Sequence, residues 1–155
     1  MSSITPPKKK CEALVFLVEY INQRSSDENW RVPQKNVAED REAIAVASAL
    51  LGRPLEEARD TGSDPVSSAL AAAAIHVLDC LVENRDEDHD VQALEEASAA
   101  LQEADAPIIA ALEDASKALL AAERKGKNRF DWIEGYESWV ENMGLGADDL
   151  EDEEA

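Results

Sequence analysis

The sequence has few of the residues on which enzymatic or metal chemistry usually depends. It contains two cysteines, Cys11 and Cys80, and two histidines, His76 and His89. Two cysteines so far apart make no disulfide framework and fit a reducing compartment, so we expect a cytoplasmic protein. His76 and Cys80 share one helical face, but the short ligand spacings of zinc sites are absent, so we expect no metal and no cofactor.

Long apolar runs and phosphate-binding glycine loops are also missing. The longest candidate span, residues 69–82, contains His76 and Asp79 and is shorter than the ~18 residues that cross a bilayer. Glu12 and Glu19 interrupt the short apolar stretch after the first lysines, so we expect neither a signal peptide nor membrane attachment. The six glycines are scattered, and no nucleophile elbow or CxxC pair is present. We therefore expect that the protein is not an enzyme.

Basic residues are the third shortage. The chain carries 34 acidic and 15 basic residues, a formal net charge of −19. The net charge is −3 over residues 1–79, −10 over 80–114, +4 over 115–129 and −10 over 130–155. Anionic surfaces of this size repel nucleic acid and anionic lipid, so we expect no direct binding to either. They attract basic partners and speed their encounter.

The composition predicts an all-α fold. Alanine, the best helix former, supplies 26 of the 155 residues, and no alternating β-branched run of strand length occurs. We expect a single-domain bundle of about five to six helices over residues 1–146. A disordered acidic tail, residues 147–155, should follow, because six of its nine residues are acids. The predicted helices are 7–24, 34–51, 65–84, 88–104, 107–125 and 128–143.

The apolar patterns also predict how these helices pack. Helix 7–24 should be deeply buried, and helix 65–84, apolar nearly all round, should be the central one. Helices 88–104 and 107–125 should form an αα-hairpin through facing stripes of alanine. Gly52 is placed to end the second helix, and Asn128 to cap the last one.

Seven acids lie on or near the predicted start of helix 88–104. Two interpretations are open: the acids form a solvated face that keeps the protein soluble, or they form a fixed array that takes the place of phosphates in the binding site of a partner. Helix neighbours at i and i+4 lie ~6 Å apart, and phosphates along a DNA strand repeat on a scale of several Å. We take these acids as an electrostatic partner-binding site: Glu83, Asp86, Glu87, Asp88, Asp90, Glu95 and Glu96.

Helix 128–143 holds four of the seven aromatic residues. Trp132, Tyr136, Trp139 and Met143 form one helical stripe, which either packs inward on the alanine-rich bundle or stays exposed and anchors a partner. Acids on another face would then form a steering rim. The candidate second contact is Asp131, Trp132, Glu134, Tyr136 and Trp139.

These features favour a non-enzymatic acidic protein that binds and inhibits or regulates a basic, nucleic-acid-handling protein or nucleoprotein complex. Its carboxylates would compete with DNA or RNA phosphates. By analogy of composition, small acidic phage proteins that act against host restriction or CRISPR defence have this character. The alternative is a helical adaptor or assembly chaperone that acts through apolar helix faces, including self-association as a homodimer. The sequence leaves the identity of the partner open.

Overall fold

The computed structural model describes residues 8–25, 33–59, 65–83 and 87–143. Over these residues the chain forms α-helices, one 3₁₀ helix and short connections, with no strand. The elements are α1 (Lys8–Ser25), α2 (Pro33–Leu51), the 3₁₀ helix η1 (Leu55–Arg59), α3 (Pro65–Glu83), α4 (Glu87–Leu101), α5 (Ala106–Lys125), α6 (Phe130–Glu137) and α7 (Trp139–Asn142). The all-α prediction is confirmed. The predicted tail, residues 147–155, lies outside the described residues.

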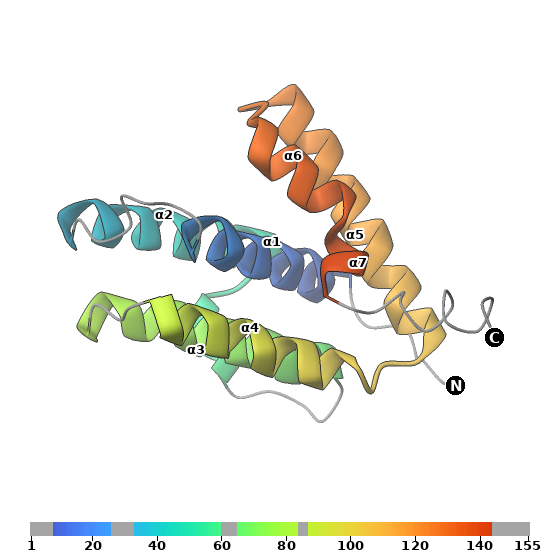
Figure 1. The fold of residues 1–155 in the computed structure, drawn as a ribbon, viewed down its shortest axis with the longest axis horizontal. Helices are drawn as coiled ribbons and strands as arrows, with labels where there is room; N and C mark the ends of the chain where they lie inside the picture. Colours follow the sequence, from blue (N-terminus) through green and yellow to red (C-terminus); the bar gives the residue numbers. More distant parts are fainter. Residues whose placement is uncertain (1–7, 26–32, 60–64, 84–86, 144–155) are drawn as a thin grey trace.

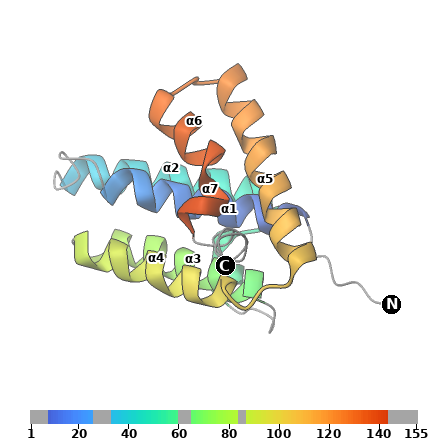
Figure 2. The same ribbon diagram turned by 45° about the vertical axis from the view of Figure 1, so that its right-hand side comes forward.

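Helix α1 is the centre of the bundle. Every residue from 13 to 21 is buried, and α2, α3, α4, α5 and α6 all pack against this helix. It runs beside α2, between the α3–α4 pair and the α5–α6 pair (Figures 1 and 2). The predicted deep burial of helix 7–24 is thus confirmed, whereas the predicted central position of helix 65–84 is wrong. Helix α3 is itself largely buried and packs on α1, α2, α4 and η1, but α5 and α6 pack on α1, which therefore holds the centre.

The predicted hairpin of helices 88–104 and 107–125 is also wrong. Helix α4 packs against α3 and α1, whereas α5 packs against α1 and α6. Helix α4 therefore pairs with α3, and α5 with α6, and α5 turns away from α4 across α1 (Figure 2). Stripes of small apolar residues accept many partners, so they show that a helix is buried without selecting its neighbour.

Two helix ends follow from left-handed backbone conformations. Gly52 has φ +84° and ends α2, as predicted. Asn128, predicted as a helix cap, instead has φ +54°, and its N–H donates to the carbonyl oxygen of Glu123 at 2.6 Å. Asparagine tolerates this conformation, so it closes the end of α5, and Arg129 takes the N-cap position of α6.

The predicted helix 128–143 is divided at Ser138. This residue has φ −110° and ψ 17°, and it separates α6 from the single turn of α7. The aromatic stripe crosses the break, with Trp139 and Met143 still buried. The end of α7 is held on α4, where Ser98 Oγ donates to the carbonyl oxygen of Met143 at 3.0 Å.

Helix α6 rests on a buried carboxyl group of α1. Glu19 is 1% exposed, and its Oε2 accepts hydrogen bonds from the amide groups of Gln23 (2.5 Å) and Asn22 (3.5 Å). Burial raises the pKa of Glu19 to about 7, although the two amides act to lower it. Gly135 of α6 lies over this carboxyl, and a Cβ there would be 2.0 Å from Glu19 Oε2. The contact therefore requires glycine inside a helix, where it is otherwise unfavourable.

We predict that Gly135→Ala lowers the free energy of unfolding by about 1–3 kcal/mol, because the added methyl group overlaps the Glu19 carboxyl. In a Glu19→Ala background the same change should become neutral or stabilising, since alanine is the better helix former by ~1 kcal/mol. Chemical denaturation of the wild type, both single variants and the double variant measures this difference. Equal effects of Gly135→Ala in both backgrounds would contradict it.

We also predict that Glu19 makes the fold less stable as the pH rises. The pKa of Glu19 is higher in the folded state (about 7) than its usual value of 4.5. The stability that this tighter proton binding adds to the fold is therefore fully present below pH 4.5 and is lost as the pH rises through 7. Relative to Glu19→Gln, the wild type should lose up to ~3 kcal/mol of unfolding free energy between pH 4.5 and 8. Denaturant titrations at both pH values measure this, and a constant difference between the two proteins would refute it.

Candidate functional site

The structure describes only part of the predicted electrostatic site. Glu95 and Glu96 are exposed on α4, and Gln92 Nε2 donates to Glu96 Oε2 at 3.5 Å. Asp86 lies outside the described residues. Glu83 is the last residue of α3, and three further acids lie in the first turn of α4: Glu87, Asp88 and Asp90. The structure describes the backbone of these four residues but not their side chains. Their part in binding stays a prediction.

The aromatic side chains of the predicted second contact lie in the core. Trp139 is 1% exposed, Tyr136 4% and Trp132 9%, whereas Asp131 and Glu134 are exposed. The interpretation as an exposed aromatic stripe is therefore wrong, and the inward-packing interpretation describes these side chains. The helical period is the same for a core face and for an interface, so the sequence pattern could not separate them. Whether Asp131 or Glu134 contacts a partner stays a prediction.

A groove of about 1120 Å³ opens beside these residues. Its walls come from α2 on one side and from α5, α6 and their connection on the other, with α1 beneath. We call it the α2–α6 groove. Both walls pack on α1, and the turn that contains Arg129 leads directly into α6. The shape of the groove therefore depends on how α6 sits on α1.

Stacked aromatic rings form the base of the α2–α6 groove. Phe16 of α1 stacks on Trp132 of α6 with ring centroids 5.7 Å apart, and Trp132 contacts Tyr136 at 5.8 Å. Tyr20 stacks on Phe16 at 6.5 Å and donates its hydroxyl hydrogen to Asp40 of α2. Burial, together with the nearby Glu19 carboxylate, raises the pKa of Tyr136 above its ordinary value, so this phenol stays neutral.

An ion pair holds the α5–α6 turn at one wall. Arg129 Nε and a terminal guanidinium nitrogen each donate to a Glu123 carboxylate oxygen at 2.8 Å, and the Arg129 backbone N–H donates at 2.9 Å. These hydrogen bonds lower the pKa of Glu123 and raise that of Arg129. The guanidinium also lies 4.3 Å from the centre of the Trp132 ring. The wall is thus tied both to α5 and to the aromatic base.

A second ion pair crosses the groove. Lys127 Nζ, just after α5, lies 3.1 Å from Glu42 Oε2 of α2, and both side chains are about 60% exposed. Exposed pairs of this kind contribute ~0–1 kcal/mol, so the link between the walls is weak.

Exposed apolar side chains lie on both walls. Among the described residues, four large hydrophobic side chains are exposed, and two of them line this groove. Val46 of α2 is 38% exposed, and Phe130, the first residue of α6, is 70% exposed. Phe130 lies in the predicted aromatic helix but outside its buried stripe. Val46 was not singled out by the sequence pattern, because its wall is completed by residues distant in the chain.

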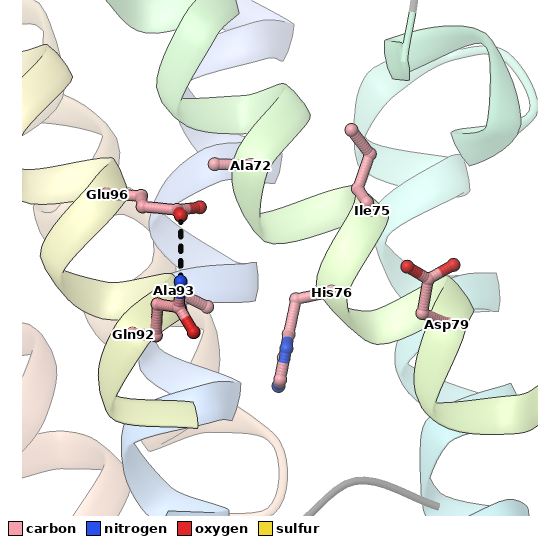
Figure 3. Close-up of a pocket in the computed structure, with 7 residues that line it drawn as sticks. All are labelled: Ala72, Ile75, His76, Asp79, Gln92, Ala93 and Glu96. Carbon is pink, nitrogen blue, oxygen red and sulfur yellow. Dashed lines mark hydrogen bonds between the residues drawn. The ribbon is translucent and has the colours of Figure 1, made fainter. Parts of the chain in front are cut away.

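A smaller hollow of about 160 Å³ lies between α3 and α4 (Figure 3). His76 extends into it from α3, and Gln92 and Glu96 border it from α4. Small-molecule sites usually enclose ~300–1,000 Å³, so this hollow is small for an organic ligand. No metal-binding group of three His, Cys, Asp or Glu side chains occurs among the described residues, and Cys80 has no described side chain.

The charges of the second half of the chain are unevenly paired. From residue 91 to 143, four of the five basic residues lie within 4 Å of an acid: Lys117, Arg124, Lys127 and Arg129. Exposed acids in the same stretch form no ion pair with a described residue: Glu95, Glu96, Glu103, Asp105, Asp114, Asp131, Glu134 and Glu141. The bases are therefore largely neutralised, while the excess carboxylates face solvent.

Over the part of the chain that the structure describes, no helix is both long enough and apolar enough to cross a membrane. Comparison with known proteins assigns no family to this chain: no protein-family model matches it, nor does any curated protein or any solved structure.

Proposed function

We propose that this protein is a non-enzymatic binding protein that inhibits or regulates a basic, nucleic-acid-handling protein or nucleoprotein complex. The observation that carries the proposal is the set of exposed carboxylates between residues 91 and 143 that form no ion pair with a described residue. Unneutralised carboxylates on rigid helices attract a cationic surface at long range and need no rearrangement on contact.

The helical setting supports competition with nucleic acid in particular. Residues three or four apart on a helix project from one face at ~6 Å spacing, which is comparable to the spacing of phosphates on a strand. Among the described residues, the exposed Asp131 and Glu134 of α6 have this spacing, whereas Glu95 and Glu96 on α4 are adjacent and belong to the acidic stretch that begins at Glu83. Lysines and arginines that bind phosphates in the partner would bind such carboxylates as well, and the nucleic acid would be excluded.

A helical adaptor that acts through apolar surface is the second candidate. The exposed Val46 and Phe130 side chains on the walls of the α2–α6 groove favour it. The predicted pairing of helices 88–104 and 107–125 does not favour it, because α4 packs mainly on α3 and α5 on α1 and α6, and the two do not form a hairpin with each other. The affinity of such an adaptor for its partner would depend little on salt. The affinity of a carboxylate-based inhibitor would fall as salt is raised.

We predict that reversing charge on α4 weakens partner binding. The immobilised protein should retain DNA- or RNA-binding proteins from a lysate and release them at moderate salt, because screening weakens exposed charge pairs. Glu95→Lys with Glu96→Lys should lower the affinity for a captured partner at least roughly tenfold. Both side chains are exposed, so the melting temperature should hardly change.

Glu56→Lys with Glu57→Lys is the matched control, because it makes the same change of charge on the exposed side chains of η1. This control should elute like the wild type if the α4 carboxylates form the contact. Equal losses in both variants would indicate a general effect of net charge. If the partner stays bound at high salt, or if both variants retain it as well as the wild type does, the proposal is contradicted and the adaptor is favoured.

A further inference from the structure

We propose that the α2–α6 groove receives an amphipathic, basic helix of the partner protein. This inference rests on the proposed function and names the segment of the partner that the protein holds. Its basis is the coincidence, in one groove, of apolar side chains on both walls and carboxylates around them. Recognition of a helix in a groove uses this combination, since the apolar face of the helix enters and its charged face remains at the rim.

The apolar part of the groove matches one face of a helix. Phe130 and Val46 are exposed on opposite walls, and the Phe16–Trp132 stack lies at the base between them. Side chains at i, i+3, i+4 and i+7 of an incoming helix would cover this surface and remove it from water. Phe16 and Trp132 are only 8% and 9% exposed, so the base adds little surface, and the 70% exposed Phe130 is the aromatic anchor of the groove.

The charge of the groove selects a basic helix over an acidic one. Four carboxylates line it, Glu39, Glu42, Glu123 and Asp131, against two cations, Lys127 and Arg129. The two cations pair with Glu42 and Glu123, so the groove carries two more carboxylates than cations, and this excess favours a basic segment. Asp131 is exposed and forms no ion pair with a described residue.

In the free protein, the Lys127–Glu42 ion pair links the two walls of the groove. A lysine or arginine of the incoming helix would replace Lys127 beside Glu42, at little cost because the pair is exposed. A second copy of this chain is a poor occupant, since its own surface carries excess acid. The acidic segment 147–155 of the same chain is a poor occupant for the same reason.

The test uses a labelled synthetic helix of leucine and lysine, with the leucines on one face, and a scrambled peptide of the same composition without that face. Binding to the full chain is measured by fluorescence anisotropy. The amphipathic peptide should bind, and the scrambled one at least tenfold more weakly.

Phe130→Ser with Val46→Ser should lower the affinity for the amphipathic peptide at least tenfold. Lys127→Ala, which frees Glu42, should raise it.

Ile75→Ser is the matched control, because Ile75 is 39% exposed but lines the hollow between α3 and α4. It should leave binding unchanged. If both peptides bind equally and the Phe130 and Val46 variant binds like the wild type, charge alone acts, so the groove inference is overturned while the proposed function stands. If a leucine–glutamate peptide binds as well as the lysine peptide, charge selection in the groove is overturned. If no peptide binds even at low salt, the groove inference and the attraction to basic partners both fail.

Discussion

The rest of the structure depends on the burial of α1 on every side. A chain with 19 excess negative charges repels itself, so its compact state relies on apolar contacts at the centre. Five helices pack on α1, and one of them, α6, does so through backbone at Gly135 over the Glu19 carboxyl. That contact places Trp132 against Phe16 and so sets one wall of the α2–α6 groove. The buried carboxyl group that positions this wall is also the group to which we attribute the predicted loss of stability at higher pH.

The sequence predicted the helices well and their partners poorly. Periodicity shows how far an apolar face extends, which is why five helices lie within a few residues of their predicted bounds. It does not show which faces meet, because the alanine stripes of α4 and α5 fit several neighbours. The buried aromatic stripe has the same spacing as an exposed one. The groove joins Val46 to Phe130 across the fold, and no local pattern links residues so distant in the chain.

Charge and shape contribute to the proposed interaction at different distances. In this proposal, the exposed carboxylates that form no ion pair with a described residue act over roughly a Debye length of ~8–10 Å and bring a basic surface near. The groove acts only on contact, and there its apolar walls distinguish a basic helix with an apolar face from one without it. The Glu123–Arg129 pair, with Glu123 8% exposed, supports a wall, whereas we propose that the exposed Lys127–Glu42 pair yields to a competing cation.

Competition with nucleic acid tests the central claim most directly. A partner captured by this protein would be purified and loaded with its labelled DNA or RNA, and the protein would be titrated into the complex while anisotropy is followed. We predict that the nucleic acid is released as the protein is added at constant salt. A ternary complex in which the nucleic acid stays bound at saturating protein would contradict it, because the carboxylates would not then occupy the place of the phosphates.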